Sequence, residues 1–237
     1  MRIHKKSVLI TNIGEWEQNA GPKLEHQWAP GRSALECATA WCEPDGPVVP
    51  SEFAALFAGH QFAGFEIESV QPEHCIRFDN LRGGPRNADL AIEATDRNGR
   101  IAITVEAKAD EPFDGTLDEM MMAALEARLK NPRSGAVRRI EQLTESLFTP
   151  RVKGQPRLVQ IRYQLMTAVA GTLAYAQEIK ATPGVAWSFW RKRASSRIAS
   201  RSTSCWSTCS RSAAIASICC CSTVIAKRWR TCGRSSG

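Results

Sequence analysis

The chain has 237 residues, of which 43% are hydrophobic and 23% charged, a composition typical of a globular protein that buries one full core. It contains no run of about 18 apolar residues and no apolar N-terminal signal segment, so we predict a cytoplasmic protein without a membrane segment. The net charge of +7 would suit a nucleic-acid-binding protein, but its uneven distribution along the chain excludes that simple interpretation.

The basic charge is concentrated in the last quarter of the chain. Residues 184–237 contain 10 of the 31 Lys and Arg residues and no Asp or Glu, which leaves residues 1–183 with a net charge of −3. The same segment contains 13 serines, six of the nine cysteines and four of the seven tryptophans. We therefore divide the chain into a domain at 1–183 and a Ser/Arg/Cys-rich tail at 184–237.

The tail resembles a coding sequence that is read in the wrong frame. Its cysteines lack the paired CxxC spacing and the neighbouring histidines of a zinc site. Codons for "AWSFW" and "ICCCS", read one frame over, give mainly apolar residues of the kind found in a buried strand. We predict that the native frame ends near residues 183–187 and that the strand expected after the last helix is missing. We therefore base no prediction of function on the tail, and its charge does not indicate a DNA-binding arm.

Two helices are predicted near the N-terminal end. Residues 31–43 carry apolar side chains at helical spacing, with Ser33 as N-cap and Glu36 three residues later, as in a capping box. Three prolines in residues 44–50 end this helix, and a short second helix begins at Ser51. Two short strands are expected next, at 65–70 and 74–79.

The clearest element is a β-hairpin at 87–110, where two alternating segments flank Asn98-Gly99, a strong hairpin signal. A two-residue loop at this dipeptide predicts a register in which opposing residue numbers sum to 197, so that Asp89 faces Lys108. The other charged residue on this face is Glu106. The opposite face is apolar and consists of Leu90, Ile92, Ala94, Ile103, Val105 and Ala107.

Helices are predicted after the hairpin, one from Thr116, one at 136–148 and a long one at 157–180. The long helix is mostly apolar, and we expect it to pack against the sheet. Its apolar residues are Leu158, Ile161, Leu165, Val169 and Leu173. A helix, a hairpin with further strands and then more helices predict an α/β or α+β domain with a mixed sheet.

The charged face of the hairpin suggests a specific chemistry. Two carboxylates on neighbouring strands repel each other unless a cation lies between them. Mg²⁺ is commonly held by one or two carboxylates together with phosphate oxygens. A lysine beside the ion would orient a water molecule and stabilise charge on a phosphate. Asp89, Glu106 and Lys108 are therefore the minimal parts for metal-assisted phosphodiester hydrolysis.

These residues resemble the signature of the PD-(D/E)XK nuclease superfamily, which has the restriction-endonuclease-like fold. That signature places an Asp on one strand and Glu-x-Lys on the following antiparallel strand, matched here by Asp89 in "ADLAI" and by Glu106 and Lys108 in "VEAKA". Ala88 replaces the proline of the motif. The order of elements agrees over roughly residues 30–180. The sequence around the hairpin is similar to that of an uncharacterised bacterial branch of the superfamily.

The resemblance implies a role for each motif residue. Asp89 and Glu106 would bind Mg²⁺ or Mn²⁺, and Lys108 would position or activate the attacking water. An additional acid from an N-terminal helix would be Glu36 or Glu52, although Glu36 is also well placed to cap its own helix. By the frame hypothesis, the restriction-endonuclease-like sheet would be truncated after the long helix, which is expected to end near residue 181.

The implied partner is nucleic acid, DNA in the first instance. Residues 128–162 contain nine basic residues and two glutamates, and the resemblance adds polar residues on the helix after the motif, including Gln160. A solvated helix pair would explain the same charges. The predicted nucleic-acid-binding residues are Arg133, Arg138, Arg139, Lys153, Arg157, Arg162 and Gln164.

Three functions fit the sequence. The first is a metal-dependent nuclease, and the second is a nuclease-like fold that binds nucleic acid or a protein without cleaving. The third is the non-functional product of a frameshifted gene. A surface hairpin with solvated Asp, Glu and Lys side chains would also produce the motif, because its pattern is degenerate.

Overall fold

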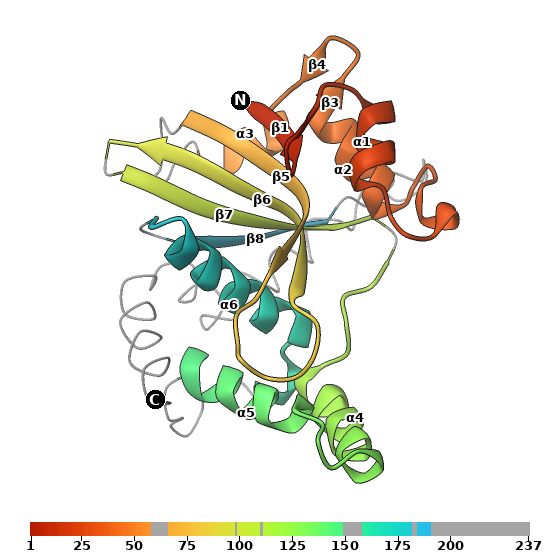
Figure 1. Ribbon diagram of the computed structural model, residues 1–237, viewed down its shortest axis with the longest axis vertical. Helices are drawn as coiled ribbons and strands as arrows, with labels where there is room; N and C mark the ends of the chain where they lie inside the picture. Colours follow the sequence, from red (N-terminus) through yellow and green to blue (C-terminus); the bar gives the residue numbers. More distant parts are fainter. Residues whose placement is uncertain (58–65, 98, 110, 149–157, 182–183, 191–237) are drawn as a thin grey trace, which may run out of the picture.

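The computed structural model describes residues 1–57, 66–97, 99–109, 111–148, 158–181 and 184–190, the last segment by its backbone (Figure 1). The helices are α1 (Ile13–Ala20), α2 (Ser33–Trp41), α3 (Ser51–Phe57), α4 (Leu117–Lys130), α5 (Ala136–Leu147) and α6 (Tyr163–Glu178), with 3₁₀ turns at Glu25–Gln27 and Leu158–Gln160. The strands are β1 (Arg2–Lys5), β2 (Val8–Ile10), β3 (Cys42–Glu43), β4 (Gly46–Pro47), β5 (Glu66–Ile76), β6 (Arg86–Asp96), β7 (Gly99–Lys108) and β8 (Gly184–Trp190).

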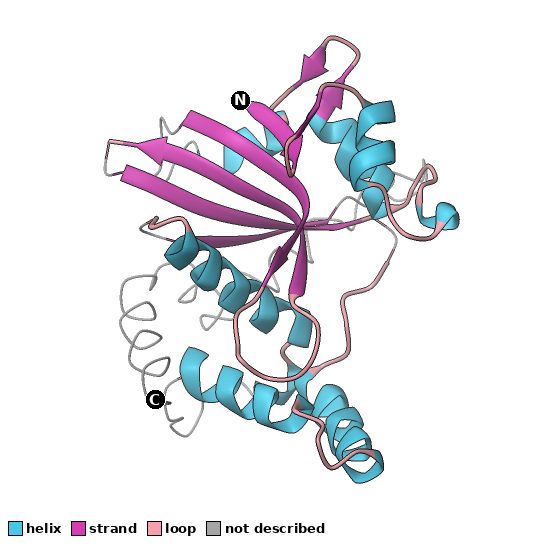
Figure 2. Ribbon diagram, in the orientation of Figure 1, coloured by secondary structure: helices cyan, strands magenta, loops and turns pink. Residues whose placement is uncertain are grey.

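A mixed sheet forms the centre of the molecule, with the strand order β2-β1-β5-β6-β7-β8. Strands β5, β6 and β7 form an antiparallel meander, and β1 and β8 add to its two sides in parallel. Helices cover both faces of this sheet (Figure 2). The predicted α/β domain with a mixed sheet is confirmed. One continuous strand, β5, stands where two were predicted at 65–70 and 74–79, and it ends at Ile76, so residues 77–79 are not part of it.

The apolar face of the hairpin lies in the main core. Its six predicted residues, from Leu90 to Ala107, are buried there together with Trp16 of α1 and Trp41 of α2. Alternation along β6 and β7 directs these side chains to one side of the sheet. The predicted apolar face is thus confirmed.

The register of the hairpin differs from the prediction. Leu90 pairs with Val105 and Asp96 with Gly99, so opposing residue numbers sum to 195 instead of 197. The prediction was wrong because Gly99, with a φ of +122°, opens β7 instead of belonging to the loop. Because the shift is two residues, every side chain keeps its predicted face.

Helix α6 covers the opposite face of the sheet with small and hydroxylated side chains. The Thr172 hydroxyl lies 2.5 Å from that of Thr104 on β7, and Tyr175 packs beside Ala91 and Ala102. The larger apolar residues predicted to meet the sheet pack instead against α4 and α5: Leu158, Ile161, Val169 and Leu173. Small side chains bring the helix close to the strands, and large ones fill the wider gap between helices.

The strand predicted to be missing after the long helix is present as β8. Its residues pair in parallel with residues 102–108 of β7. Strand pairing is made by the backbone, and Val185, Trp187 and Phe189 are residue types that favour strands. The expected truncation of the sheet is therefore wrong. Residues 191–237 of the predicted tail lie outside the described residues.

The start of α2 also differs from the predicted capping box. Arg32 occupies the N-cap position but its side chain does not cap the helix, and Ser33 is the first helical residue. The Ser33 amide and hydroxyl donate to the carboxylate of Glu111, at 3.3 and 3.2 Å. The segment that leaves the motif strand therefore supplies the acceptor for the first turn of α2.

Candidate active site

The central sheet splits at the end of the hairpin that carries the motif. The pairing of β6 with β7 ends at Leu90 and Val105, while β7 continues to pair with β8 as far as Lys108. The two strands then separate, and β6 runs on beside β5 (Figure 1). Beyond the last pair, the backbone N–H of Ala107 donates to the Asp89 carboxylate at 2.5 Å. The Asp89 side chain thus replaces a strand carbonyl as the acceptor.

Glu106 is at the centre of a buried network. Its Oε2 lies 2.7 Å from Nη2 of Arg86, and its Oε1 lies 3.0 Å from Nζ of Lys108. The side-chain amide of Gln164 also donates to Oε1. The side chains of Glu106 and Arg86 are each only 5% exposed. This carboxylate is therefore paired with two cations and fixed in orientation.

Helix α6 supplies the second wall of the network. Gln164, Thr167 and Gly171 follow one another at helical spacing and share one side of the helix. Besides donating to Glu106, Gln164 accepts from the backbone N–H of Asp114 at 3.4 Å. The Thr167 hydroxyl accepts from Nη1 of Arg86 at 3.3 Å. The start of α6 is thereby fixed above the split in the sheet.

Asp89 has a different electrostatic environment. Burial raises its pKa to about 8, the charge of Glu106 contributes to this rise, and the Ala107 hydrogen bond and Lys108 offset part of it. Burial also raises the pKa of Glu73 on β5, with a smaller contribution from Glu106. Glu73, Asp89 and Glu106 therefore form a set of carboxylates that repel one another.

The three motif residues meet at this site as predicted. Lys108 pairs directly with Glu106, and Asp89 interacts electrostatically with both. In the observed register, Asp89 lies opposite Glu106, just beyond the last pair of β6 and β7, and not opposite Lys108.

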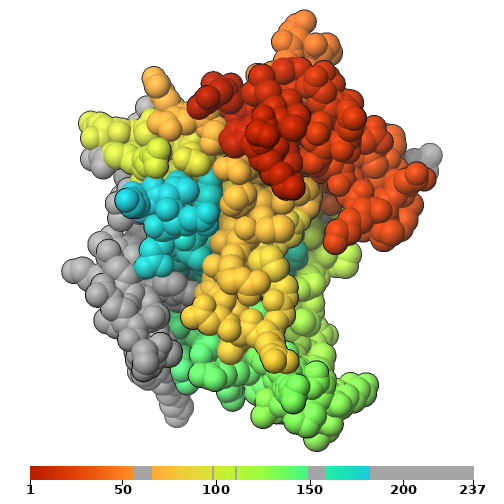
Figure 3. Space-filling view, viewed as in Figure 1, coloured from red at the N-terminus to blue at the C-terminus, as the bar shows by residue number. Residues whose placement is uncertain are grey.

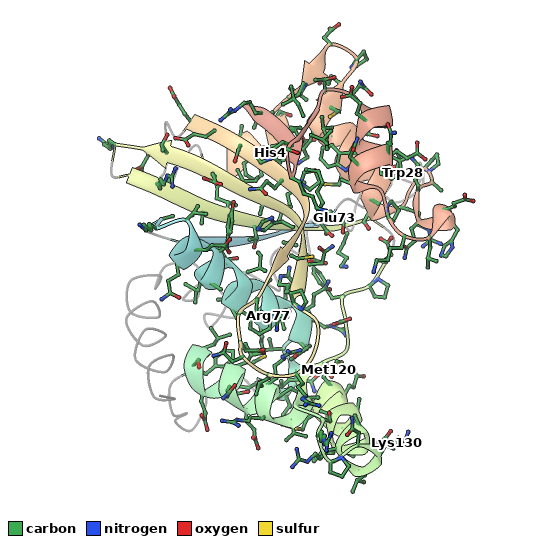
Figure 4. All side chains as sticks on the ribbon, viewed as in Figure 1. His4, Trp28, Glu73, Arg77, Met120 and Lys130 are labelled. Atoms are coloured by element: carbon green, nitrogen blue, oxygen red, sulfur yellow. The ribbon has the colours of Figure 1, made fainter. Side chains whose placement is uncertain are left out.

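The two helix acids predicted as additional ligands have other partners. The Glu36 carboxylate accepts from the backbone N–H of Gly31 at 2.7 Å, so it serves the start of its own helix. Glu52 is exposed and accepts from the hydroxyl of Ser51 at 3.1 Å. Glu73 is the acid that lies near the motif, at the centre of the molecule where the strands cross (Figure 4).

The predicted nucleic-acid-binding residues that the structure describes divide into an exposed group and an engaged group. Arg133, Arg138 and Arg162 are exposed, and Arg162 donates to the backbone carbonyl of Asp114. Two of the others are engaged inside the protein, Gln164 with Glu106 and Arg139 with Asp79. Lys153 and Arg157 lie outside the described residues.

Arg139 has a structural role in this fold. Its guanidinium donates twice to Asp79, at 2.5 and 3.1 Å, and lies over the ring of Phe78. The hydrogen bond to Asp79 raises the pKa of Arg139. These contacts attach α5 to the segment between β5 and β6, which runs down the front of the molecule in the space-filling view (Figure 3).

Sequence reasoning missed Glu73 and Arg86. Glu73 follows Pro72 in what looked like a gap between strands, and its φ of +51° marks a bend in β5. The signal for Arg86 was indirect. Gly171 interrupts an otherwise good helical sequence, which indicates a close neighbour.

The fold and the site define a mixed α/β protein with a carboxylate–lysine cluster where its sheet splits. The chain belongs to the family described as domain of unknown function (DUF6946), whose model matches residues 9–186. No curated protein and no solved structure matches the chain. In the described part of the chain, no helix is long and apolar enough to cross a membrane. No group of three or more His, Cys, Asp or Glu residues there has the arrangement of a metal site.

Proposed function

We propose that this protein is a metal-dependent nuclease of the restriction-endonuclease-like fold that hydrolyses phosphodiester bonds in nucleic acid. The observation that carries the proposal is the meeting of Asp89, Glu106 and Lys108 where β6 and β7 separate. The order of elements supports it, since α2, the meander β5–β7, α6 and the parallel strand β8 follow one another. The superfamily resemblance rests on the same residues.

The chemistry of the donors supports a hard divalent cation. Asp89 and Glu73 are oxygen donors whose pKa values are raised by burial and by neighbouring carboxylates, so each would gain from a cation nearby. Asp89 and Glu106 would hold Mg²⁺ or Mn²⁺. When bound, such an ion polarises a phosphoryl oxygen and lowers the pKa of a coordinated water.

The side chains of the site divide the remaining work. The Lys108 ammonium, 3.0 Å from Glu106, would orient the attacking water and stabilise negative charge on the phosphate. Gln164 and Arg86 hold the Glu106 carboxylate in one orientation. The exposed Arg133 and Arg138 would contact the nucleic-acid backbone, which we expect to be DNA.

A cleavage assay tests this proposal. The full chain is incubated with Mg²⁺ or Mn²⁺ and with plasmid DNA, single-stranded DNA or RNA. We expect metal-dependent cleavage that falls by about 100-fold or more in Lys108→Ala, since a lysine that stabilises the transition state is lost. The control is Lys23→Ala, which removes an exposed lysine. Equal cleavage by Lys108→Ala and the unmodified chain would refute the role of Lys108.

A second candidate is a nuclease-like module that binds nucleic acid without cleaving it. It is favoured by the pairing of Glu106 with Arg86 and Lys108, which already neutralises the motif glutamate. Binding of DNA in a gel-shift assay, together with no cleavage under any metal condition, would support this alternative over the enzyme.

A further inference from the structure

Arg86 is a buried cation that the motif does not contain. It begins β6, three residues before Asp89, and its guanidinium donates to Glu106 at 2.7 Å and to Thr167 at 3.3 Å. Its Nε is buried and has no hydrogen-bond partner among the described residues. A buried arginine with an unsatisfied N–H is costly, so it needs a reason beyond packing.

Helix α6 is shaped to admit this arginine. A Cβ built at Gly171 would lie 2.9 Å from Cδ of Arg86 and 3.4 Å from its Nε. Glycine inside a helix costs about 1 kcal/mol relative to alanine. The glycine therefore gives up helix stability at the one turn of α6 where the Arg86 side chain passes.

We infer that Arg86 is a positioning residue that acts as an internal counter-cation, which holds Glu106 and competes with the divalent cation for its charge. This inference rests on the proposed metal site. Both Glu106 oxygens are already engaged, Oε2 by Arg86 and Oε1 by Lys108 and Gln164. An ion that binds Oε2 must displace the Arg86 guanidinium, and an ion that binds Oε1 meets a carboxylate whose charge Arg86 already offsets. The Arg86 contact therefore lowers the affinity of Glu106 for the ion.

Removal of Arg86 is expected to change the affinity for the ion and the rate of cleavage in opposite directions. Without Arg86, the Glu106 carboxylate keeps one cationic partner among the described residues, Lys108, so its attraction for a divalent ion increases. Its orientation is also less well fixed, so cleavage is expected to slow. A purely structural ion pair would change stability but would leave the affinity of the folded protein for the ion unchanged.

The test measures Mn²⁺ binding to the full chain by electron paramagnetic resonance of the free ion, without substrate. We expect Arg86→Met to bind Mn²⁺ about tenfold more tightly than the unmodified chain, and Arg86→Lys to lie close to it. Asp89→Asn is expected to lose binding. Circular dichroism establishes that each variant is folded.

The outcomes distinguish the two proposals. If Asp89→Asn binds Mn²⁺ as well as the unmodified chain, the metal site itself is refuted. If Asp89→Asn loses binding while folded Arg86→Met has unchanged or weaker affinity, the role of Arg86 is refuted and the metal site stands.

A second variant covers the case in which Arg86→Met does not fold. Gly171→Ala pushes on the Arg86 stem without removing its charge. The matched control is Gly84→Ala, because a Cβ there meets nothing within 4 Å. We expect Mn²⁺ affinity to rise about threefold in Gly171→Ala and not in the control. Unchanged affinity in both variants would overturn the inference.

Discussion

Glu106 and Asp89 are neighbouring carboxylates in opposite electrostatic environments. Glu106 is the more deeply buried of the two, yet Arg86, Lys108 and Gln164 compensate its charge. Asp89 receives one backbone hydrogen bond, and burial and Glu106 raise its pKa to about 8. The protein therefore stabilises Glu106 as an ion, whereas the positive charge near Asp89 does not offset the effect of its burial.

This difference assigns distinct tasks to the two residues. A fully compensated carboxylate holds its neighbours in place, and its loss disturbs the fold. An uncompensated carboxylate gains most from an added cation and limits stability when it ionises.

Replacement of Glu106 by Ala should destabilise the protein most. Arg86 and Lys108 would remain without their counter-ion, and Arg86 is almost completely buried. Breaking a buried pair by removing one partner costs roughly 3–5 kcal/mol. Chemical denaturation would measure this loss in the free energy of unfolding.

The control for this prediction is Glu66→Ala, which removes an exposed glutamate from the start of β5. We expect a change within about 0.5 kcal/mol, as for most surface substitutions. Similar small losses for both variants would mean that the Glu106 network contributes little to folding, and the contrast with Asp89 would fail.

The stability of the metal-free protein should fall as the pH rises, because of Asp89. Its pKa is about 8 in the folded chain against an ordinary value of 3.8, so the folded state binds an extra proton between these pH values. Stability from this group is complete below about pH 4 and is lost as the pH rises through about 8. We expect a loss on the order of 2–3 kcal/mol, about half of what such a shift gives an isolated group.

Asp89→Asn isolates this contribution, because the amide does not titrate. Denaturation curves of both chains at several pH values should converge at low pH and separate toward pH 8, with the variant the more stable. A constant difference in unfolding free energy across this range would show that Asp89 ionises normally in the folded protein.

The sequence was sufficient to predict features that depend on local periodicity. Alternation in β6 and β7 fixed which side chains share a face, so the apolar core and the meeting of Asp89, Glu106 and Lys108 followed from it. The register was wrong by two residues because a turn dipeptide restricts where a hairpin closes without fixing which residue opens the next strand.

Features that depend on contacts between distant segments were not predictable in this way. Arg86 reaches Glu106 through the pairing of strands and the position of α6, and Glu73 enters the site through a bend in β5. The sheet-facing side of α6 carries small or hydroxylated residues, such as Gly171, Thr172 and Tyr175, which give no apolar stripe in the sequence. The stripe of larger apolar residues therefore led to the wrong prediction of which side of α6 packs against the sheet.

Glu73 provides the smallest and most specific test of the contrast between the carboxylates. Its pKa is raised by burial and by Glu106, and its charge in turn raises the pKa of Asp89. Glu73 therefore resembles Asp89, and not Glu106, in its electrostatic environment. Glu73→Gln should change the free energy of unfolding by less than about 1 kcal/mol but weaken Mn²⁺ binding about threefold to tenfold. The matched control is Glu36→Gln, whose amide oxygen can still accept from Gly31. Equal Mn²⁺ affinity in the two variants would limit the cation's carboxylates to Asp89 and Glu106, and Glu73 would then act only through its hydrogen bond from Asn87.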